Sequence, residues 1–164
     1  MLQQKLNEEL GTKNIKKKEL PDYILNCLSQ QRNLRPYQEE CLRYFLSYME
    51  DSEERPKRPH LLFHMATGSG KTLIMAATML YLYENGYRNF LFFVDTNNIV
   101  EKTKDNFLNR ASSKYLFAPQ IVINGKNVEI RQVENFQNSS SDGINLRLTT
   151  IQGLHSVLNS NKEN

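Results

Sequence analysis

The stretch Met65-Ala-Thr-Gly-Ser-Gly-Lys-Thr72 (MATGSGKT) decides the fold of this chain. Gly68 and Gly70 have no Cβ, so the backbone there can curl until successive N–H groups point inward at phosphate oxygens. A helix is predicted to begin at Lys71, and its positive N-terminal dipole faces the same place. The pattern matches G-x-x-x-x-G-K-[ST] except that Met65 replaces the first glycine. The stretch therefore predicts a phosphate-binding loop between a strand and a helix.

Each residue of this loop has an expected task. We expect Lys71 to reach the β- and γ-phosphates of a triphosphate and the Thr72 hydroxyl to bind Mg²⁺. These two residues are the candidate catalytic residues. The predicted nucleotide-binding positions of the loop are Thr67, Gly68, Ser69, Gly70, Lys71 and Thr72.

Strands and helices are predicted to alternate from residue 60 onward. In chain order the predicted elements are strand 60–65, helix 71–85, strand 90–95, helix 97–109, strand 121–123, strand 144–150 and a short helix ending at Leu158. Alternation of this kind predicts an α/β fold with a parallel sheet, which binds its ligand at the carboxyl ends of the strands. The run 90–95 (FLFFVD) is apolar at successive positions, so we expect helices to cover both of its faces.

The first third of the chain is predicted to be helical. Residues 1–33 are interpreted as an N-terminal helical extension, in which Leu2, Leu6 and Leu10 share one face. A further helix is expected to open near Pro36. Residues 34–164 are interpreted as the nucleotide-binding domain, in which the polar segment 125–143 is expected to be a mobile insertion with weak strand signals.

Length and composition exclude several classes of protein. The chain has 164 residues, 39% of them hydrophobic, which suits one domain and excludes a wholly disordered chain. The net charge of +3 does not by itself diagnose nucleic-acid binding. The two cysteines and three histidines lack metal-ligand spacing. Neither a transmembrane run nor a secretory signal is apparent, so we expect a cytoplasmic protein.

Four segments together resemble the start of a superfamily-two, DEAD/DEAH-box-like helicase motor. They are LRPYQ (34–38), MATGSGKT (65–72), FFVDTNNIVEKT (92–103) and LTTIQGLHSVLN (148–159). More narrowly, the chain resembles the restriction (Res) subunit of type III restriction enzymes. The resemblance implies a RecA-like P-loop domain of an ATP-dependent DNA helicase or translocase. It also implies double-stranded DNA, a second RecA-like domain, a nuclease domain and a DNA-methyltransferase modification subunit as partners.

The resemblance also assigns residues outside the loop. Gln38 would read the donor and acceptor edge of adenine with its amide, and Arg35 would flank the base or a phosphate. The alternative for Gln38 is a polar residue on the surface of a helix. Small polar residues after two strands would contact the DNA backbone: Thr96, Asn97, Asn98, Thr149, Thr150 and Gln152. For Thr96, capping of the following helix is an equally favoured interpretation.

One part of the expected machinery is missing from the sequence. Hydrolysis needs a carboxylate to hold Mg²⁺ and a neighbour to position water, usually an Asp-Glu pair at a strand end. No Asp-Glu dipeptide occurs in these residues. We therefore expect an N-terminal piece of a longer enzyme, truncated before the DEAD/DEAH box and deficient in hydrolysis. The alternative is a small kinase-type phosphotransferase that uses Asp95 as its magnesium carboxylate.

Overall fold

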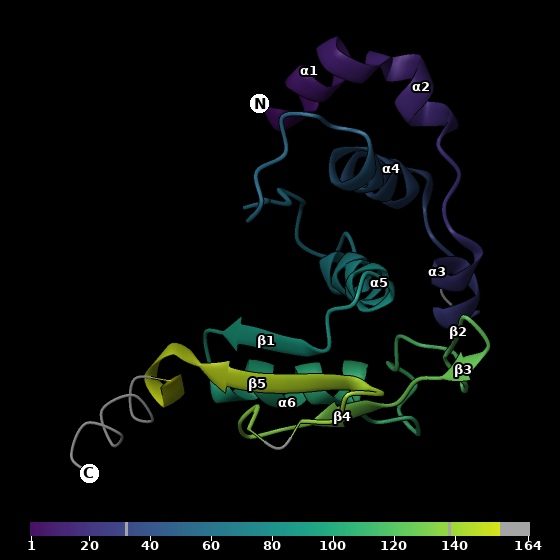
Figure 1. Cartoon of the computed structure of the whole chain (residues 1–164). Coiled ribbons are helices and arrows are strands. Elements are labelled where there is room, and N and C mark those ends of the chain that lie inside the picture. The colour runs from purple at the N-terminus through teal and green to yellow at the C-terminus, as the bar shows by residue number, and fades with distance from the viewer. Residues whose placement is uncertain (32, 138, 155–164) are drawn as a thin grey trace.

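A parallel sheet forms the lower layer of the molecule (Figure 1). The computed structural model describes residues 1–31, 33–137 and 139–154. Strands β1 (Asn89–Val94), β5 (Ile144–Thr150) and β4 (Ile130–Gln132) lie side by side in the order β1-β5-β4, and both pairings are parallel. The predicted α/β class with a parallel sheet and helices is confirmed.

Helix α6 (Asn97–Phe107) covers one face of this sheet. The ring of Phe92 on β1 lies 5.6 Å from that of Phe107, which is buried. The opposite face of β1 is open, because Leu91 and Phe93 are 42% and 46% exposed. The prediction that helices cover both faces of this strand is therefore wrong for the described residues. Helix α6 covers one face, and the face that carries Leu91 and Phe93 is exposed.

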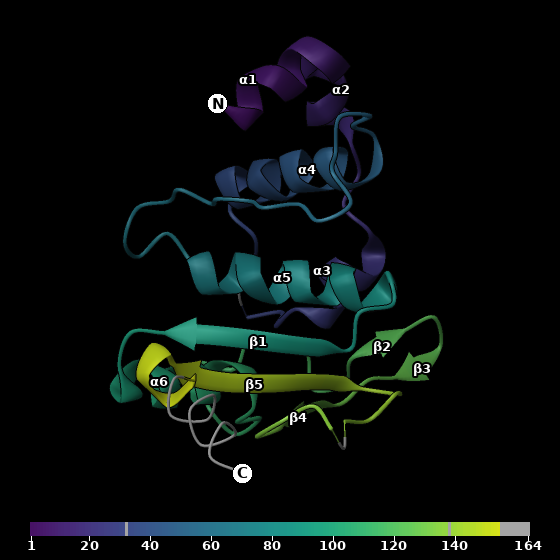
Figure 2. The ribbon, with the colours of Figure 1, turned by 60° about the vertical axis from the view of Figure 1, so that its left-hand side comes forward.

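Helix α5 (Lys71–Glu84) lies between the sheet and α4 (Pro36–Glu50) (Figure 2). Its apolar residues pack against α4 and against α3 (Asp22–Cys27), with the Phe45 and Tyr81 rings 5.1 Å apart. As predicted, α5 ends just before Gly86, whose φ is +93°. Two helices and the loops around them thus hold α5 above the open sheet.

The predicted strand 60–65 is not a strand in the structure. The segment has no regular secondary structure, and its alternate residues Leu61, Phe63 and Met65 are half-buried against the main core. The Phe63 ring lies 6.1 Å from that of Phe45 on α4. The apolar side chains of residues 60–65 thus pack against α4, and no described strand pairs with the backbone of this segment.

The N-terminal 33 residues contribute to two separate cores. Helix α1 (Leu2–Leu6), the π-turn η1 (Asn7–Gly11) and α2 (Thr12–Lys17) pack onto the end of α4 through a small cluster of Leu6, Ile15 and Tyr48. Ile24 and Leu28, in contrast, lie in the main core, and Leu28 forms a bridge with Phe117. The predicted lead-in is helical, but its second half is built into the main core.

The polar segment 125–143 contributes strands. Strands β2 (Val122–Ile123) and β3 (Lys126–Asn127) form an antiparallel hairpin, so the predicted strand 121–123 lies outside the main sheet. Strand β4, which follows, pairs with β5 from Ile130 to Gln132. The expected insertion therefore supplies the third strand of the sheet. The reason is non-local: β4 is stabilised by β5, which lies later in the chain.

Residues 151–154 are helical, and the rest of the helix predicted to end at Leu158 lies outside the described residues. Within the described part of the chain, no helix has the length and apolar character needed to cross a membrane.

Candidate nucleotide site

Residues 66–70 form a tight turn that leads directly into α5; we call this turn the phosphate loop. The turn is closed by a hydrogen bond from the Ser69 N–H to the Ala66 carbonyl at 3.2 Å. Gly68 and Gly70 adopt φ values of +78° and +83°, a region that favours glycine. Helix α5 then starts at Lys71, so the loop has the curled backbone and the helix N-terminus that anion binding requires.

The Lys71 ammonium lies across the loop. Its Nζ donates to the carbonyls of Met65 and Ala66 at 3.0 and 2.9 Å. Phosphate oxygens carry negative charge, so an ammonium binds them more strongly than it binds neutral carbonyls. A bound triphosphate can therefore replace these two acceptors.

Two hydroxyl groups complete the candidate site, one in the phosphate loop and one at the start of α5. Ser69 Oγ is buried and has no hydrogen-bond partner among the described residues. A buried polar atom without a partner is costly, and a ligand oxygen or a metal-bound water would satisfy it. Thr72 is half-buried in the first turn of α5. These residues fit a magnesium–triphosphate group.

The first turn of α4 lies directly against the phosphate loop. Gln38 is only 4% exposed, so the interpretation as a surface residue is wrong. Its Oε1 accepts the Arg35 N–H at 2.9 Å, and its Nε2 donates to the Ser69 carbonyl at 2.8 Å. An amide offers two N–H donors and two lone pairs, so these bonds use half of its capacity. The other half matches the N6 donor and the N7 acceptor of adenine.

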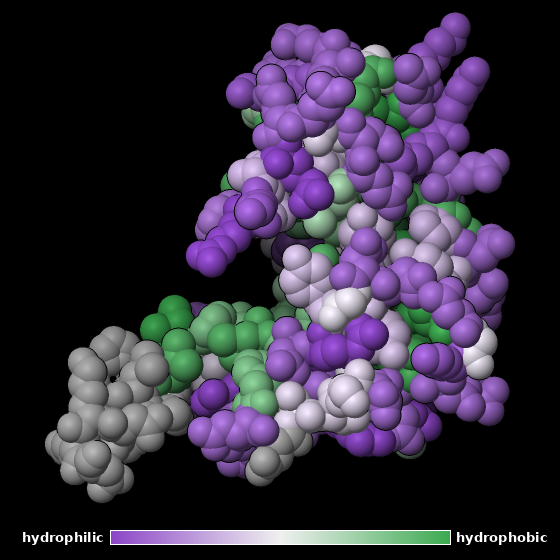
Figure 3. All heavy atoms as spheres, in the orientation of Figure 1, coloured by the Kyte–Doolittle hydropathy of each residue, from purple (hydrophilic) through white to green (hydrophobic). Residues whose placement is uncertain are grey.

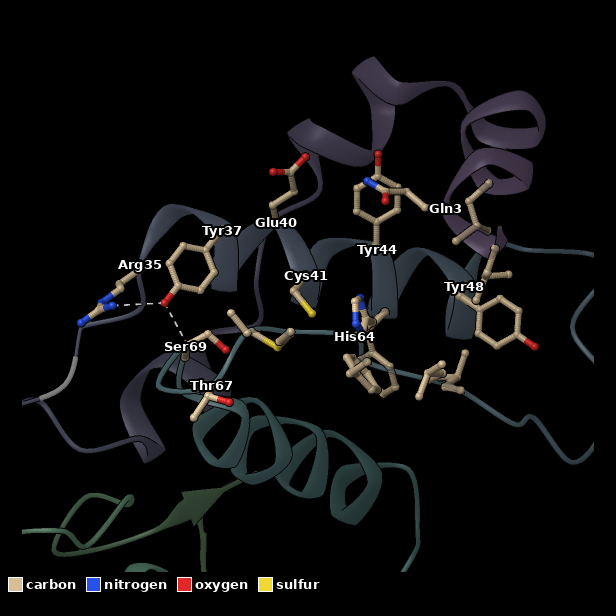
Figure 4. Close-up of a pocket in the computed structure, with 18 of the residues that line it drawn as sticks. Gln3, Arg35, Tyr37, Glu40, Cys41, Tyr44, Tyr48, His64, Thr67 and Ser69 are labelled. Carbon is tan, nitrogen blue, oxygen red and sulfur yellow. Dashed lines mark hydrogen bonds between the residues drawn. The ribbon is translucent and has the colours of Figure 1, made fainter.

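Tyr37 makes a second contact between α4 and the loop, which the sequence reasoning missed. Its hydroxyl donates to the Ser69 carbonyl at 2.9 Å and accepts from Arg35 Nη1 at 3.2 Å (Figure 4). A signal for this contact was present in the sequence: Pro36 begins α4, so Tyr37 and Gln38 both fall in the first turn of that helix. Residues 35–38 therefore approach the loop as one unit.

A cavity of about 720 Å³ opens beside the phosphate loop. Figure 4 shows Tyr37, Cys41, Tyr44 and Tyr48 along its α4 wall, with Thr67 and Ser69 at the loop end. Burial raises the pKa of the Cys41 thiol, which keeps it neutral. The cavity is also lined by apolar residues such as Leu61, Phe63 and Met65. Flat, apolar ligand surfaces fit beside this wall.

The residues predicted to contact DNA lie together at one end of the sheet. In the β1–β5 register Phe93 pairs with Thr149 and Val94 with Thr150, so the two strand ends coincide. Thr96, Asn97 and Asn98 follow β1 directly and are exposed. Thr150 Oγ1 accepts the Gly153 N–H at 3.1 Å, and Gln152 is exposed in the same turn. Thr96 is the N-cap residue of α6, as the alternative interpretation predicts, although its side chain makes no capping hydrogen bond.

This end of the sheet and the phosphate loop lie on the same side of the molecule. Figure 2 shows the carboxyl ends of β1 and β5 and the N-terminus of α5 all directed to the left. Figure 3 shows a deep indentation on that side, between the sheet and the helices above it. The structure thus brings both sets of predicted residues to one open edge.

Comparison with known proteins decides the family. The family model described as "Type III restriction enzyme, res subunit" matches residues 31–164. This chain belongs to that Res family. A relative described as a probable type III restriction-modification enzyme HindVIP Res subunit, from Haemophilus influenzae, is 42% identical over 155 residues. The alignment covers 88% of this chain but 29% of the relative. No solved structure gives a significant match.

Family membership also separates the two interpretations of Asp95. The Res family model spans the segment that contains Asp95, and the comparisons do not favour the kinase-type alternative. Asp95 is exposed immediately after β1. Among the described residues, no cluster of three or more His, Cys, Asp or Glu side chains forms a metal-binding group. In this Res-family chain the candidate magnesium ligand therefore remains the Thr72 hydroxyl in the first turn of α5.

Proposed function

We propose that this chain is the ATP-binding portion of an ATP-dependent DNA translocase or helicase that serves a type III restriction system. The observation that carries the proposal is the direct contact between the base-side residue Gln38 and the phosphate loop, at the Ser69 carbonyl. A nucleotide bound here would contact a base-reading group on α4 and phosphate-binding groups in the loop before α5. These two parts of the chain are already in contact. Membership of the Res family supports the same function.

Under this proposal the nucleotide is ATP with Mg²⁺. Lys71 takes the β- and γ-phosphates in exchange for the carbonyls of Met65 and Ala66, and Thr72 ligates the metal. Mg²⁺ neutralises the phosphate charge when bound. Arg35 and Gln38 orient the base, and residues 67–70 wrap the phosphates through their N–H groups. We propose that the domain is RecA-like and begins near residue 34.

The DNA-binding part of the proposal uses the open sheet end. Six polar residues would contact a DNA backbone through hydroxyl, amide and helix N-terminal groups: Thr96, Asn97, Asn98, Thr149, Thr150 and Gln152. Such contacts position DNA and carry no sequence information. They are supported by the β1–β5 register, which puts the two segments side by side.

The longer protein would supply the remaining parts. This chain spans 29% of the length of its Haemophilus relative. We propose that further domains provide the acidic motor box, a second RecA-like domain and a nuclease, and that a DNA-methyltransferase subunit is a partner. Because the 164 residues contain no Asp-Glu dipeptide, we expect them to bind ATP with little turnover.

The test is equilibrium binding of a fluorescent ATP analogue with Mg²⁺. Lys71→Ala should weaken binding by about 10–100-fold, the range expected for lost charge-assisted bonds. Lys126→Ala is the matched control, because Lys126 is an exposed lysine in the β2–β3 hairpin. Equal affinities of the Lys71→Ala and Lys126→Ala proteins would contradict the proposal.

A further inference from the structure

The Ser69 carbonyl of the phosphate loop accepts two side-chain hydrogen bonds from α4. Tyr37 Oη donates at 2.9 Å and Gln38 Nε2 at 2.8 Å. A carbonyl oxygen has two lone pairs, so these donors fill its capacity. The Ser69–Gly70 peptide cannot rotate without breaking both bonds.

The direction of this carbonyl fixes the direction of the next N–H. No cis peptide bond is present in the described chain, and in a trans peptide the C=O and N–H groups point opposite ways. With the Ser69 oxygen held toward α4, the Gly70 N–H points away from α4. Glycine tolerates many conformations, and the loop has Gly68 on one side and Gly70 on the other. The loop sequence alone therefore does not determine how this peptide is oriented.

Arg35 determines which way the Tyr37 hydroxyl donates. A guanidinium has donors and no acceptor, so the bond between Arg35 Nη1 and Tyr37 Oη makes the hydroxyl an acceptor there. The phenolic proton is then available for the Ser69 carbonyl. Tyr37 is 41% exposed, so burial alone does not fix its ring.

We propose that Tyr37 is a positioning residue of the nucleotide site, which orients the Ser69–Gly70 peptide so that the Gly70 N–H is presented to a phosphate oxygen. The inference rests on the proposed function and deepens it. Tyr37 acts through the loop and not on the base. Its removal therefore affects every ligand that carries the same phosphates, whatever its base.

The variant Tyr37→Phe tests this, because it removes the hydroxyl and keeps the ring. Affinities for ATP, GTP and inorganic tripolyphosphate should fall by the same factor, about three- to tenfold, as expected for one hydrogen bond. The matched control is Tyr83→Phe, which removes a phenol bond of the same kind, from Tyr83 Oη to the Asp142 carbonyl at 3.1 Å. Its affinities should equal those of the wild-type chain.

The outcomes separate the two proposals. If Lys71→Ala does not weaken binding, the proposed function fails. If Lys71→Ala weakens binding but Tyr37→Phe behaves like Tyr83→Phe, the positioning role is wrong. Loss of ATP affinity with unchanged tripolyphosphate affinity would instead place Tyr37 on the base and would also overturn it.

A measurement without ligand keeps the inference testable on the free chain. In amide NMR spectra the Gly70 signal should shift or broaden in Tyr37→Phe, because the peptide then samples a second orientation. In Tyr83→Phe that signal should stay unchanged. Identical Gly70 signals in the wild-type and Tyr37→Phe proteins would contradict a clamp on this peptide.

Discussion

The side-chain amide of Gln38 lies against Gly70, so closely that Nε2 occupies the space a Cβ at position 70 would need. The same Nε2 donates to the Ser69 carbonyl at 2.8 Å. The start of α4 and the start of α5 therefore share one packed contact at the phosphate loop. Substitutions on either side of this contact should affect both elements.

Gly70→Ala should destabilise the chain more than Gly68→Ala. Both glycines have φ near +80°, so both variants bear the left-handed cost of about 1–2 kcal/mol. Only at position 70 does the new methyl collide with Gln38, whose amide would have to leave its two hydrogen bonds; nothing lies within 4 Å of a Cβ at Gly68. Urea unfolding should show an extra loss of about 1–3 kcal/mol.

A double variant checks the cause of that extra loss. In Gly70→Ala/Gln38→Ala the collision is removed, so the two changes should be less costly together than the sum of the single changes. Additive free energies of unfolding would mean that Gln38 is not the obstructing group.

Gln38→Ala should reduce the preference for ATP over GTP. The amide is held by Arg35 and by the Ser69 carbonyl, with one donor and one acceptor position left for the base. Competitive binding should show lower affinity for both nucleotides and a ratio close to one. Tyr37→Phe is the comparison, since it should lower both affinities while the ratio stays. A preserved ATP preference in Gln38→Ala would remove the adenine-reading role.

Asn145→Leu should destabilise the sheet by about 2 kcal/mol or more. Asn145 is 1% exposed. Its Nδ2 donates to Asn89 Oδ1 at 2.9 Å and to the Ser140 carbonyl at 2.8 Å, and its Oδ1 accepts the Ser140 N–H at 3.0 Å. Buried partners left unsatisfied cost about 1–3 kcal/mol each. Thermal or urea unfolding should show this loss. The control Asn127→Leu changes an exposed residue of β3 and should stay near the wild-type value.

The two faces of β1 should respond differently to truncation. Phe107→Ala removes a ring that is 1% exposed beneath Phe92 and should cost about 3–5 kcal/mol. Phe93→Ala, on the open face, should cost about 1 kcal/mol or less, because the ring is 46% exposed. Comparable losses in the free energy of unfolding would mean that the Phe93 face is covered in solution.

The sequence by itself determined the features that depend on neighbouring residues. The glycines of the phosphate loop, the start of α4 at Pro36 and the end of α5 before Gly86 follow from backbone preferences within a few positions. The alternating residues of β5 predicted a strand correctly for the same reason. The order of motifs was sufficient to recognise the Res family, which the comparison confirmed.

Only the tertiary structure decided the features that depend on distant residues. Residues 60–65 carry a strand pattern, yet their apolar side chains pack on α4, and β4 exists because β5 pairs with it. The open face of β1 was equally hidden, because an apolar run does not reveal whether a second layer covers it. The contacts of Tyr37 and Gln38 with Ser69 join residues more than 30 positions apart. Such contacts depend on how two helices pack, which no local pattern specifies.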